Sequence, residues 1–120
     1  MNPRLIALSG PLKGQIFPLG EETLNLGRDQ VNRISIADMA VSRRHCTIQK
    51  EDDSFRLIDL ESRNGTFVGS VPVNERILKN GDQIRIVNSL FLFLTGDGDT
   101  LPVQSAVEVE DEQLVTYSSM

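Results

Sequence analysis

Residues 24–49 read LNLGRDQVNRISIADMAVSRRHCTIQ, and this stretch decides the fold class. Three short runs in it alternate apolar and polar residues with a period of two: Leu24–Gly27, Arg33–Ile36 and Cys46–Gln49. This period is typical of strands with one buried face, because successive side chains point to opposite sides of a sheet. The segments between the runs are polar and short, and none carries a helical repeat. The stretch therefore predicts three short strands joined by polar loops.

The same pattern continues on both sides of this stretch. Further apolar or alternating runs lie at Arg4–Ser9, Gln15–Leu19, Phe55–Leu57, Ile84–Ile86 and Phe91–Leu94. Residues that favour turns separate them, as in Gly10–Gly14, Glu51–Asp53, Asn64–Gly65 and Asn80–Asp82. About ten or eleven short strands at this spacing, with no sustained 3.6-residue period, predict an all-β sandwich or barrel.

The length and the charge distribution predict one domain followed by a tail. The chain has 120 residues, 12 basic and 17 acidic, for a net charge of −5. All 12 basic residues and 11 acidic ones lie in residues 1–94, whereas residues 95–120 carry six acids and no base. We therefore expect a near-neutral domain over residues 1–95 and an acidic tail or interdomain linker over 96–120. The net negative charge argues against direct nucleic-acid binding.

Several other classes of protein are excluded by what the sequence lacks. A single cysteine, Cys46, cannot form an intramolecular disulfide, and no signal peptide or long apolar run is present, so a cytoplasmic protein with no membrane partner is expected. His45 and Cys46 are the only residues of their kinds, and as strand neighbours they do not form a nucleophilic pair. No zinc-ligand cluster and no nucleotide-binding glycine loop occurs. We expect no metal, no cofactor and no enzymatic activity.

Four predicted loop segments carry residues of one chemical type. Three of them suit an oxyanion: Gly27-Arg28, Ser42-Arg43-Arg44-His45 and Ser62-Arg63-Asn64-Gly65-Thr66. The fourth, Val73-Asn74, follows shortly after. Binding residues are often carried by loops that a rigid scaffold positions. If these loops converge, their guanidinium groups and a serine hydroxyl supply the donors that a phosphate requires.

Together these segments resemble the forkhead-associated (FHA) family, a phosphothreonine-peptide-binding module. The resemblance rests on LNLGRDQVNRISIADMAVSRRHCTIQ, FRLIDLESRNGTFV and LKNGDQIRIV, and it covers about residues 4–94. Gly-Arg, then Ser-Arg-Arg-His after 13 intervening residues, then Ser-x-Asn-Gly-Thr form the family signature. The resemblance implies a two-sheet β-sandwich of about eleven strands that binds a phosphothreonine-containing peptide or protein with loops at one end.

The resemblance also implies a role for each matching position. The phosphopeptide would be bound by Arg28, Ser42, Arg43, Arg63 and Asn64. The loops would be shaped by Gly27, His45 and Gly65. Arg44 would point away and add only positive potential. This chain has Gly69-Ser70 where the family often has Asn-Gly, and Asn74 does not replace that asparagine.

The leading hypothesis is therefore a non-catalytic reader of phosphothreonine in signal transduction, and oligomeric state is left open. The resemblance places such a module at the N-terminus of a larger bacterial regulator, ahead of a sensory or transcription-activating domain. The alternative is an FHA-fold assembly domain that binds a partner independently of phosphorylation. The joint presence of Arg28, Ser42 and Asn64 favours the reader.

Overall fold

The computed structural model describes residues 2–96, which form eleven strands and no helix. The strands are β1 (Arg4–Ser9), β2 (Ile16–Pro18), β3 (Leu24–Gly27), β4 (Ile34–Ser35), β5 (Cys46–Glu51), β6 (Ser54–Asp59), β7 (Phe67–Val68), β8 (Val71–Pro72), β9 (Glu75–Ile77), β10 (Gln83–Ile86) and β11 (Ser89–Leu94). The expected all-β fold of about eleven short strands is confirmed. Apart from Gly96, the predicted tail lies outside the described residues.

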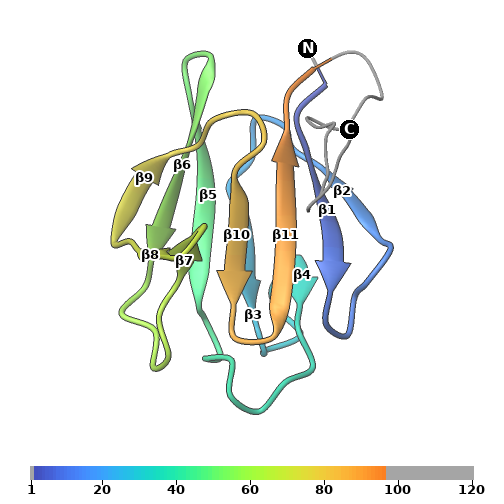
Figure 1. Cartoon of the computed structure of the whole chain (residues 1–120), viewed down its shortest axis with the longest axis vertical. Helices are drawn as coiled ribbons and strands as arrows, with labels where there is room; N and C mark the ends of the chain where they lie inside the picture. The colour runs from blue at the N-terminus through green and yellow to red at the C-terminus, as the bar shows by residue number, and fades with distance from the viewer. Residues whose placement is uncertain (1, 97–120) are drawn as a thin grey trace, which may run out of the picture.

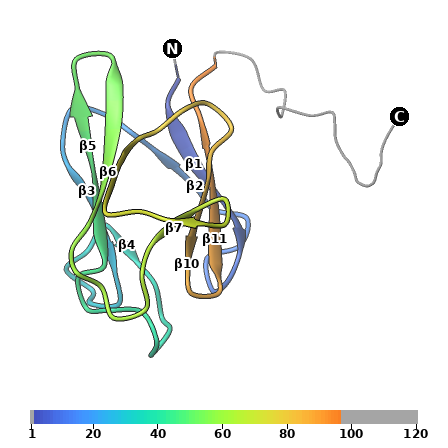
Figure 2. The same cartoon turned by 60° about the vertical axis from the view of Figure 1, so that its left-hand side comes forward.

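The strands form two sheets that pack face to face (Figure 2). A six-stranded sheet has the order β2-β1-β11-β10-β7-β8, and a five-stranded sheet has the order β4-β3-β5-β6-β9. All pairs are antiparallel except β3 with β4, whose register aligns Leu26 with Ile34. The sequence pattern allowed either a sandwich or a barrel. The structure is a two-sheet sandwich, and the described strands form no closed barrel.

The core lies between the sheets and is built by the alternating apolar residues. Leu26, Ile48 and Leu57 of the five-stranded sheet are at most 1% exposed. They face a layer from the other sheet that includes Phe91 and Phe93, and Phe93 contacts Phe55 edge to face with ring centroids 5.9 Å apart. Two of the four edge strands, β2 and β4, are shorter than the sequence pattern predicts, with three and two residues.

Three loops converge at one end of this sandwich. The β3–β4, β4–β5 and β6–β7 loops lie at the lower end in Figure 1, whereas the chain leaves β11 at the upper end. The longest of them connects β4 to β5 over residues 36–45. These are the loops that carry the three oxyanion segments, so the fold brings together residues that are up to 38 positions apart in the sequence (Arg28 to Thr66). Within residues 2–96 no helix is long and apolar enough to cross a membrane.

Candidate functional site

Ser42 connects all three loops. Its Oγ accepts a hydrogen bond from the backbone N–H of Arg63 at 2.9 Å, which joins it to the β6–β7 loop. Its carbonyl oxygen accepts one from the backbone N–H of Arg28, also at 2.9 Å, which joins it to the β3–β4 loop. The structure therefore places Arg28, Ser42 and Arg63 next to one another. Backbone groups and the Ser42 hydroxyl link their three loops to one another.

His45 holds the backbone of two of these loops, β4–β5 and β6–β7. The ring is fully buried, its Nδ1 accepts a hydrogen bond from the backbone N–H of Ser42 at 3.1 Å, and its Nε2 lies 2.8 Å from the carbonyl oxygen of Gly65. Because Nδ1 accepts, Nε2 carries the proton and donates to Gly65. Gly65 has a φ of +85°, a conformation that glycine adopts without steric cost. The imidazole thus contacts loop backbone on both sides.

Gly27 permits a close approach between β3 and the β4–β5 loop. A Cβ atom at this position would collide with the carbonyl oxygen of Arg43 and with Nδ2 of Asn32. Asn32 is 5% exposed, and its Nδ2 donates to the carbonyl oxygens of Asp29 and Arg43, each at 2.7 Å. Asn32 therefore holds the backbone that carries Arg43. Sequence reasoning missed it, although an asparagine in a loop that precedes a strand is a common backbone-binding residue.

Asp59, at the end of β6, anchors the β6–β7 loop and was also missed. One carboxylate oxygen accepts from the hydroxyls of Ser62 and Thr66 at 2.5 and 2.7 Å, and the other accepts from the backbone N–H of Ser62 at 3.0 Å. Burial alone raises the pKa of Asp59, but the hydrogen bonds from Ser62 and Thr66 outweigh it and lower the pKa overall. The loop that carries Arg63 and Asn64 is thus tied to an ionised carboxylate.

Asn64 lies at the exposed edge of the site. Its Nδ2 donates a hydrogen bond to the carbonyl oxygen of Ala40 at 2.7 Å, which links the β6–β7 loop to the β4–β5 loop once more. Its amide oxygen has no hydrogen bond to any residue in the range 2–96. This oxygen remains accessible to a backbone N–H of a bound peptide.

The arginines of these loops have no counter-charge in the part of the chain that the structure describes. Arg28, Arg43 and Arg63 form no ion pair there, whereas Arg56 pairs with Glu51 and Arg76 with Asp82. Nε of Arg28 is buried without a hydrogen-bond partner, and its Nη1 lies 3.5 Å from Sδ of the exposed Met39. These guanidinium groups therefore keep their donors for an anion.

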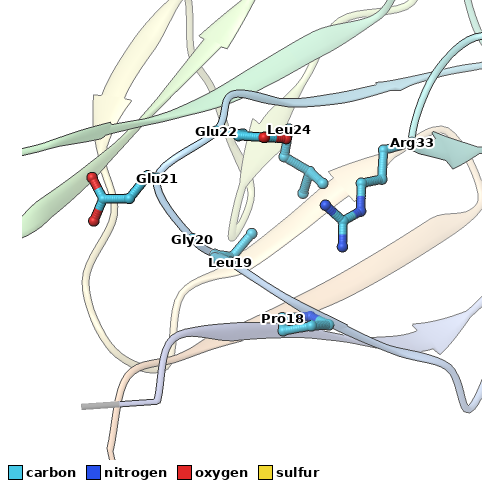
Figure 3. Close-up of a pocket in the computed structure, with 7 residues that line it drawn as sticks. All are labelled: Pro18, Leu19, Gly20, Glu21, Glu22, Leu24 and Arg33. Carbon is cyan, nitrogen blue, oxygen red and sulfur yellow. The ribbon is translucent and has the colours of Figure 1, made fainter.

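A hollow of about 480 Å³ lies away from these three loops, between the β2–β3 connection and the residue before β4 (Figure 3). The guanidinium group of Arg33 extends over it toward Pro18 and Leu19, while the carboxylate of Glu21 turns away. Glu21 forms an ion pair with Lys50 instead. Both acidic and basic residues line the hollow, and none of the predicted site residues lies in it. The hollow is therefore a poorer candidate for an oxyanion site than the three loops.

Cys46 has the environment of a core residue. It is fully buried, and burial raises the pKa of its thiol to about 12 despite a hydrogen bond with Thr66. A thiol is nucleophilic only as the thiolate, so this cysteine is inert at neutral pH. In addition, no group of three or more His, Cys, Asp or Glu side chains within residues 2–96 is arranged to hold a metal ion.

Comparisons with known proteins agree with this arrangement. The model of the FHA domain family matches residues 24–87, which include the three loops. The chain belongs to the FHA domain family. This family membership confirms the predicted class, a phosphopeptide-binding signalling module, and the predicted two-sheet sandwich. A solved FHA domain from work on phosphothreonine-dependent FHA domain interactions has a TM-score of 0.73 and 32% identity, and covers 80% of this chain and 98% of its own.

Two curated relatives are regulatory proteins by name. An oxoglutarate dehydrogenase inhibitor of Corynebacterium jeikeium is 38% identical over 92 residues, or 77% of this chain and 64% of its own length. The glycogen accumulation regulator GarA of Mycolicibacterium smegmatis is also 38% identical over 92 residues, or 77% of this chain and 58% of its own length. This chain thus spans less than two thirds of the length of these relatives, and neither relative is named as an enzyme.

Proposed function

We propose that this FHA domain is a non-catalytic reader of phosphothreonine on a partner protein. The observation that carries the proposal is a set of guanidinium groups that form no ion pair within residues 2–96, on loops that Ser42 and His45 hold together. Uncompensated positive charges on adjacent loops repel one another, and a phosphate with a charge near −2 placed among them relieves that repulsion. The donors that these loops carry support such a role for the site.

Each residue then has a distinct role. Arg28 donates charge-assisted hydrogen bonds from its guanidinium group, whose buried Nε has no other partner. Ser42 donates its hydroxyl proton to a phosphate oxygen while the same oxygen continues to accept from Arg63 N–H. The side chains of Arg43 and Arg63 add charge on either side, and Asn64 binds the peptide backbone and fixes its register.

One comparison supports threonine as the phosphorylated residue, and the net charge is compatible with a peptide as its carrier. The solved FHA domain that resembles this chain at 32% identity comes from work on phosphothreonine-dependent interactions. The net charge of −5 is also compatible with this ligand, because a single phosphate requires only a few placed arginines, unlike a nucleic-acid backbone. The alternative of phosphorylation-independent assembly would leave the unpaired loop arginines without a use.

The direct test is a titration of a phosphothreonine peptide library and its unphosphorylated counterpart against the full chain. We expect binding only when threonine is phosphorylated, and a loss of roughly ten- to a hundredfold in affinity for Arg28→Ala, since a charged hydrogen bond contributes about 1.5–3 kcal/mol. Arg85→Ala, which removes an exposed arginine on β10, is the matched control and should bind like the wild type. Equal affinity for both peptide forms would refute the proposal.

For the wider context we propose a larger bacterial regulator, in which residues 96–120 connect this FHA domain to a further domain. The curated relatives are shorter than such a protein, because 92 aligned residues already account for 64% and 58% of their lengths. Recovery of the natural gene product by mass spectrometry tests this proposal. A product with a further folded domain supports it, and a product of about 120 residues contradicts it.

A further inference from the structure

A small hollow lies on the outer face of the five-stranded sheet, outside the set of residues that the proposed function uses. It encloses about 170 Å³ and is lined by Asn25, Val31, Asn32, Arg44, Thr47 and Leu60. Sites for whole small molecules usually measure roughly 300–1,000 Å³. This hollow is therefore the size of a socket for one protruding side chain.

Thr47 lines this socket with an unused polar group. Its neighbours Cys46 and Ile48 point into the core, so Thr47 faces the opposite side of the sheet. It is nevertheless only 8% exposed, and its Oγ1 has no hydrogen-bond partner within residues 2–96. Buried hydroxyl groups are nearly always hydrogen-bonded, so this one is available to a polar group that enters the hollow.

The other polar groups of the socket define the chemistry of that ligand. Asn25 lies opposite Thr47 in the β3–β5 pairing and carries an exposed amide. Arg44 is exposed and forms no ion pair with any described residue, although the resemblance to the family gave it only a general electrostatic role. A hydroxyl, an amide and a guanidinium group together present donors to one anionic acceptor, as a carboxylate requires.

Two apolar side chains form the rim of the socket. Val31 is 71% exposed and Leu60 is 40% exposed, and both belong to the small group of large apolar residues that the domain leaves in contact with solvent. Apolar groups around a polar contact exclude water from it in protein–protein interfaces. The rim therefore fits a protein segment in which an acidic side chain is flanked by apolar residues.

We propose that this socket is a second contact for the phosphorylated partner and that it receives a glutamate or aspartate side chain of that partner. This inference rests on the proposed function, because the same partner is bound through its phosphothreonine by the loops. Asn32 belongs to both regions: it lines the socket, and its Nδ2 binds the carbonyl oxygen of Arg43 at 2.7 Å. The socket thus adjoins the phosphate-binding loops and extends the recognised surface beyond them.

The test is a glutamate scan in phosphothreonine peptides of otherwise alanine sequence, measured against the full chain. We expect one position at which glutamate raises affinity about tenfold and glutamine does not. Thr47→Val should abolish that gain and keep the affinity for the all-alanine parent, because it removes only the hydroxyl and valine suits a strand. Arg44→Gln should also abolish the gain, whereas Arg85→Gln, on β10 of the other sheet, should retain it. The inference would be overturned if glutamate raised the affinity at no position, or if it raised the affinity of Thr47→Val as much as that of the wild type.

A second measurement separates this inference from the proposed function. If no phosphothreonine peptide binds, the proposed function fails, and the socket is then probed alone with N-acetylglutamate N-methylamide by NMR of the labelled full chain. Chemical-shift changes at the amides of Asn25 and Thr47, absent with the glutamine analogue and in Thr47→Val, would support a socket for an acidic side chain. Saturating probe without a change at Thr47 would overturn it.

Discussion

Oγ of Ser42 accepts a hydrogen bond from the backbone N–H of Arg63, 21 positions further along the chain, at 2.9 Å. The bond uses a lone pair of the hydroxyl and leaves its proton without an acceptor in residues 2–96. One side chain can therefore hold two loops together and still donate to a ligand. Stability and binding are coupled at this atom, and substitutions there should affect both.

Ser42→Ala should lower the free energy of unfolding by about 1 kcal/mol, because it removes one hydrogen bond between loops. It should also weaken binding of a phosphothreonine peptide by at least about tenfold, because the phosphate loses a charge-assisted donor. Urea unfolding measures the first effect and isothermal titration calorimetry the second. Ser42→Thr keeps the hydroxyl and serves as the control. Unchanged peptide affinity in Ser42→Ala would contradict the role given to this hydroxyl.

His45→Ala should have a larger effect on stability than on any single ligand contact. The substitution leaves the N–H of Ser42 and the carbonyl oxygen of Gly65 without their partners and creates a cavity under the loops. We expect a loss of about 2–4 kcal/mol, together with faster hydrogen–deuterium exchange at the amide of Ser42. Arg63→Ala, which removes an exposed side chain, should leave that exchange rate unchanged. Continued protection of the Ser42 amide in His45→Ala would show that another group holds it.

Much of this architecture could be predicted from the sequence because strands depend on local alternation. The runs around Leu26, Ile48 and Ile84 identify their strands without knowledge of the partner strands. The loop segments could be identified by their residue types, and the family resemblance gave their convergence. The short edge strands were less predictable, because their length depends on pairing. At Asn64-Gly65, both residues tolerate a positive φ, but only Gly65 adopts one.

The supporting contacts of the site could not be predicted in the same way. Asn32 and Asp59 are ordinary polar residues in the sequence, and their importance arises from the path of a loop that lies elsewhere in the chain. Arg44 is another example, since only the fold places it beside Thr47 and Leu60. Hydrogen-bond partners between loops depend on three-dimensional convergence, whereas residue type alone indicates only that a partner is needed.

Cys46 should resist alkylation as long as the protein is folded. With a pKa of about 12, only about one thiol in ten thousand is ionised at pH 8, against about one in ten for an ordinary cysteine. The reaction with iodoacetamide should therefore be about a thousandfold slower in the native chain than in concentrated guanidinium chloride, as measured by mass spectrometry. Equal rates in the two conditions would mean that the thiol is exposed.

Asp59 should contribute a pH-dependent part of the stability. Its pKa in the folded state lies below its ordinary value of 3.8, so its contribution is complete above that value and is lost as the pH falls through the folded pKa. Asp59→Asn should lower the free energy of unfolding at pH 7 by about 1–2 kcal/mol, a modest value because the group is partly exposed. The difference from the wild type should shrink below pH 3.8, as followed by urea unfolding. Ser62→Ala, which removes one donor to Asp59, should reproduce part of the effect, and a difference that grows in acid would contradict this account.

Gly27→Ala tests the close approach on which the arginine loops depend. The added methyl group would collide with the carbonyl oxygen of Arg43, a backbone atom that cannot rotate away, and with Nδ2 of Asn32. We expect the free energy of unfolding to fall by about 1–3 kcal/mol from overpacking. The phosphothreonine interaction should also weaken, because the backbone of Arg43 has to move.

Gly20→Ala is the matched control: a Cβ atom there meets nothing within 4 Å, and φ is not positive. That variant should be neutral or more stable by up to about 1 kcal/mol, since alanine reduces the freedom of the unfolded chain. Thermal unfolding and peptide titration of both variants provide the comparison, and equal behaviour of the two would show that β3 and the β4–β5 loop are not in the tight contact described.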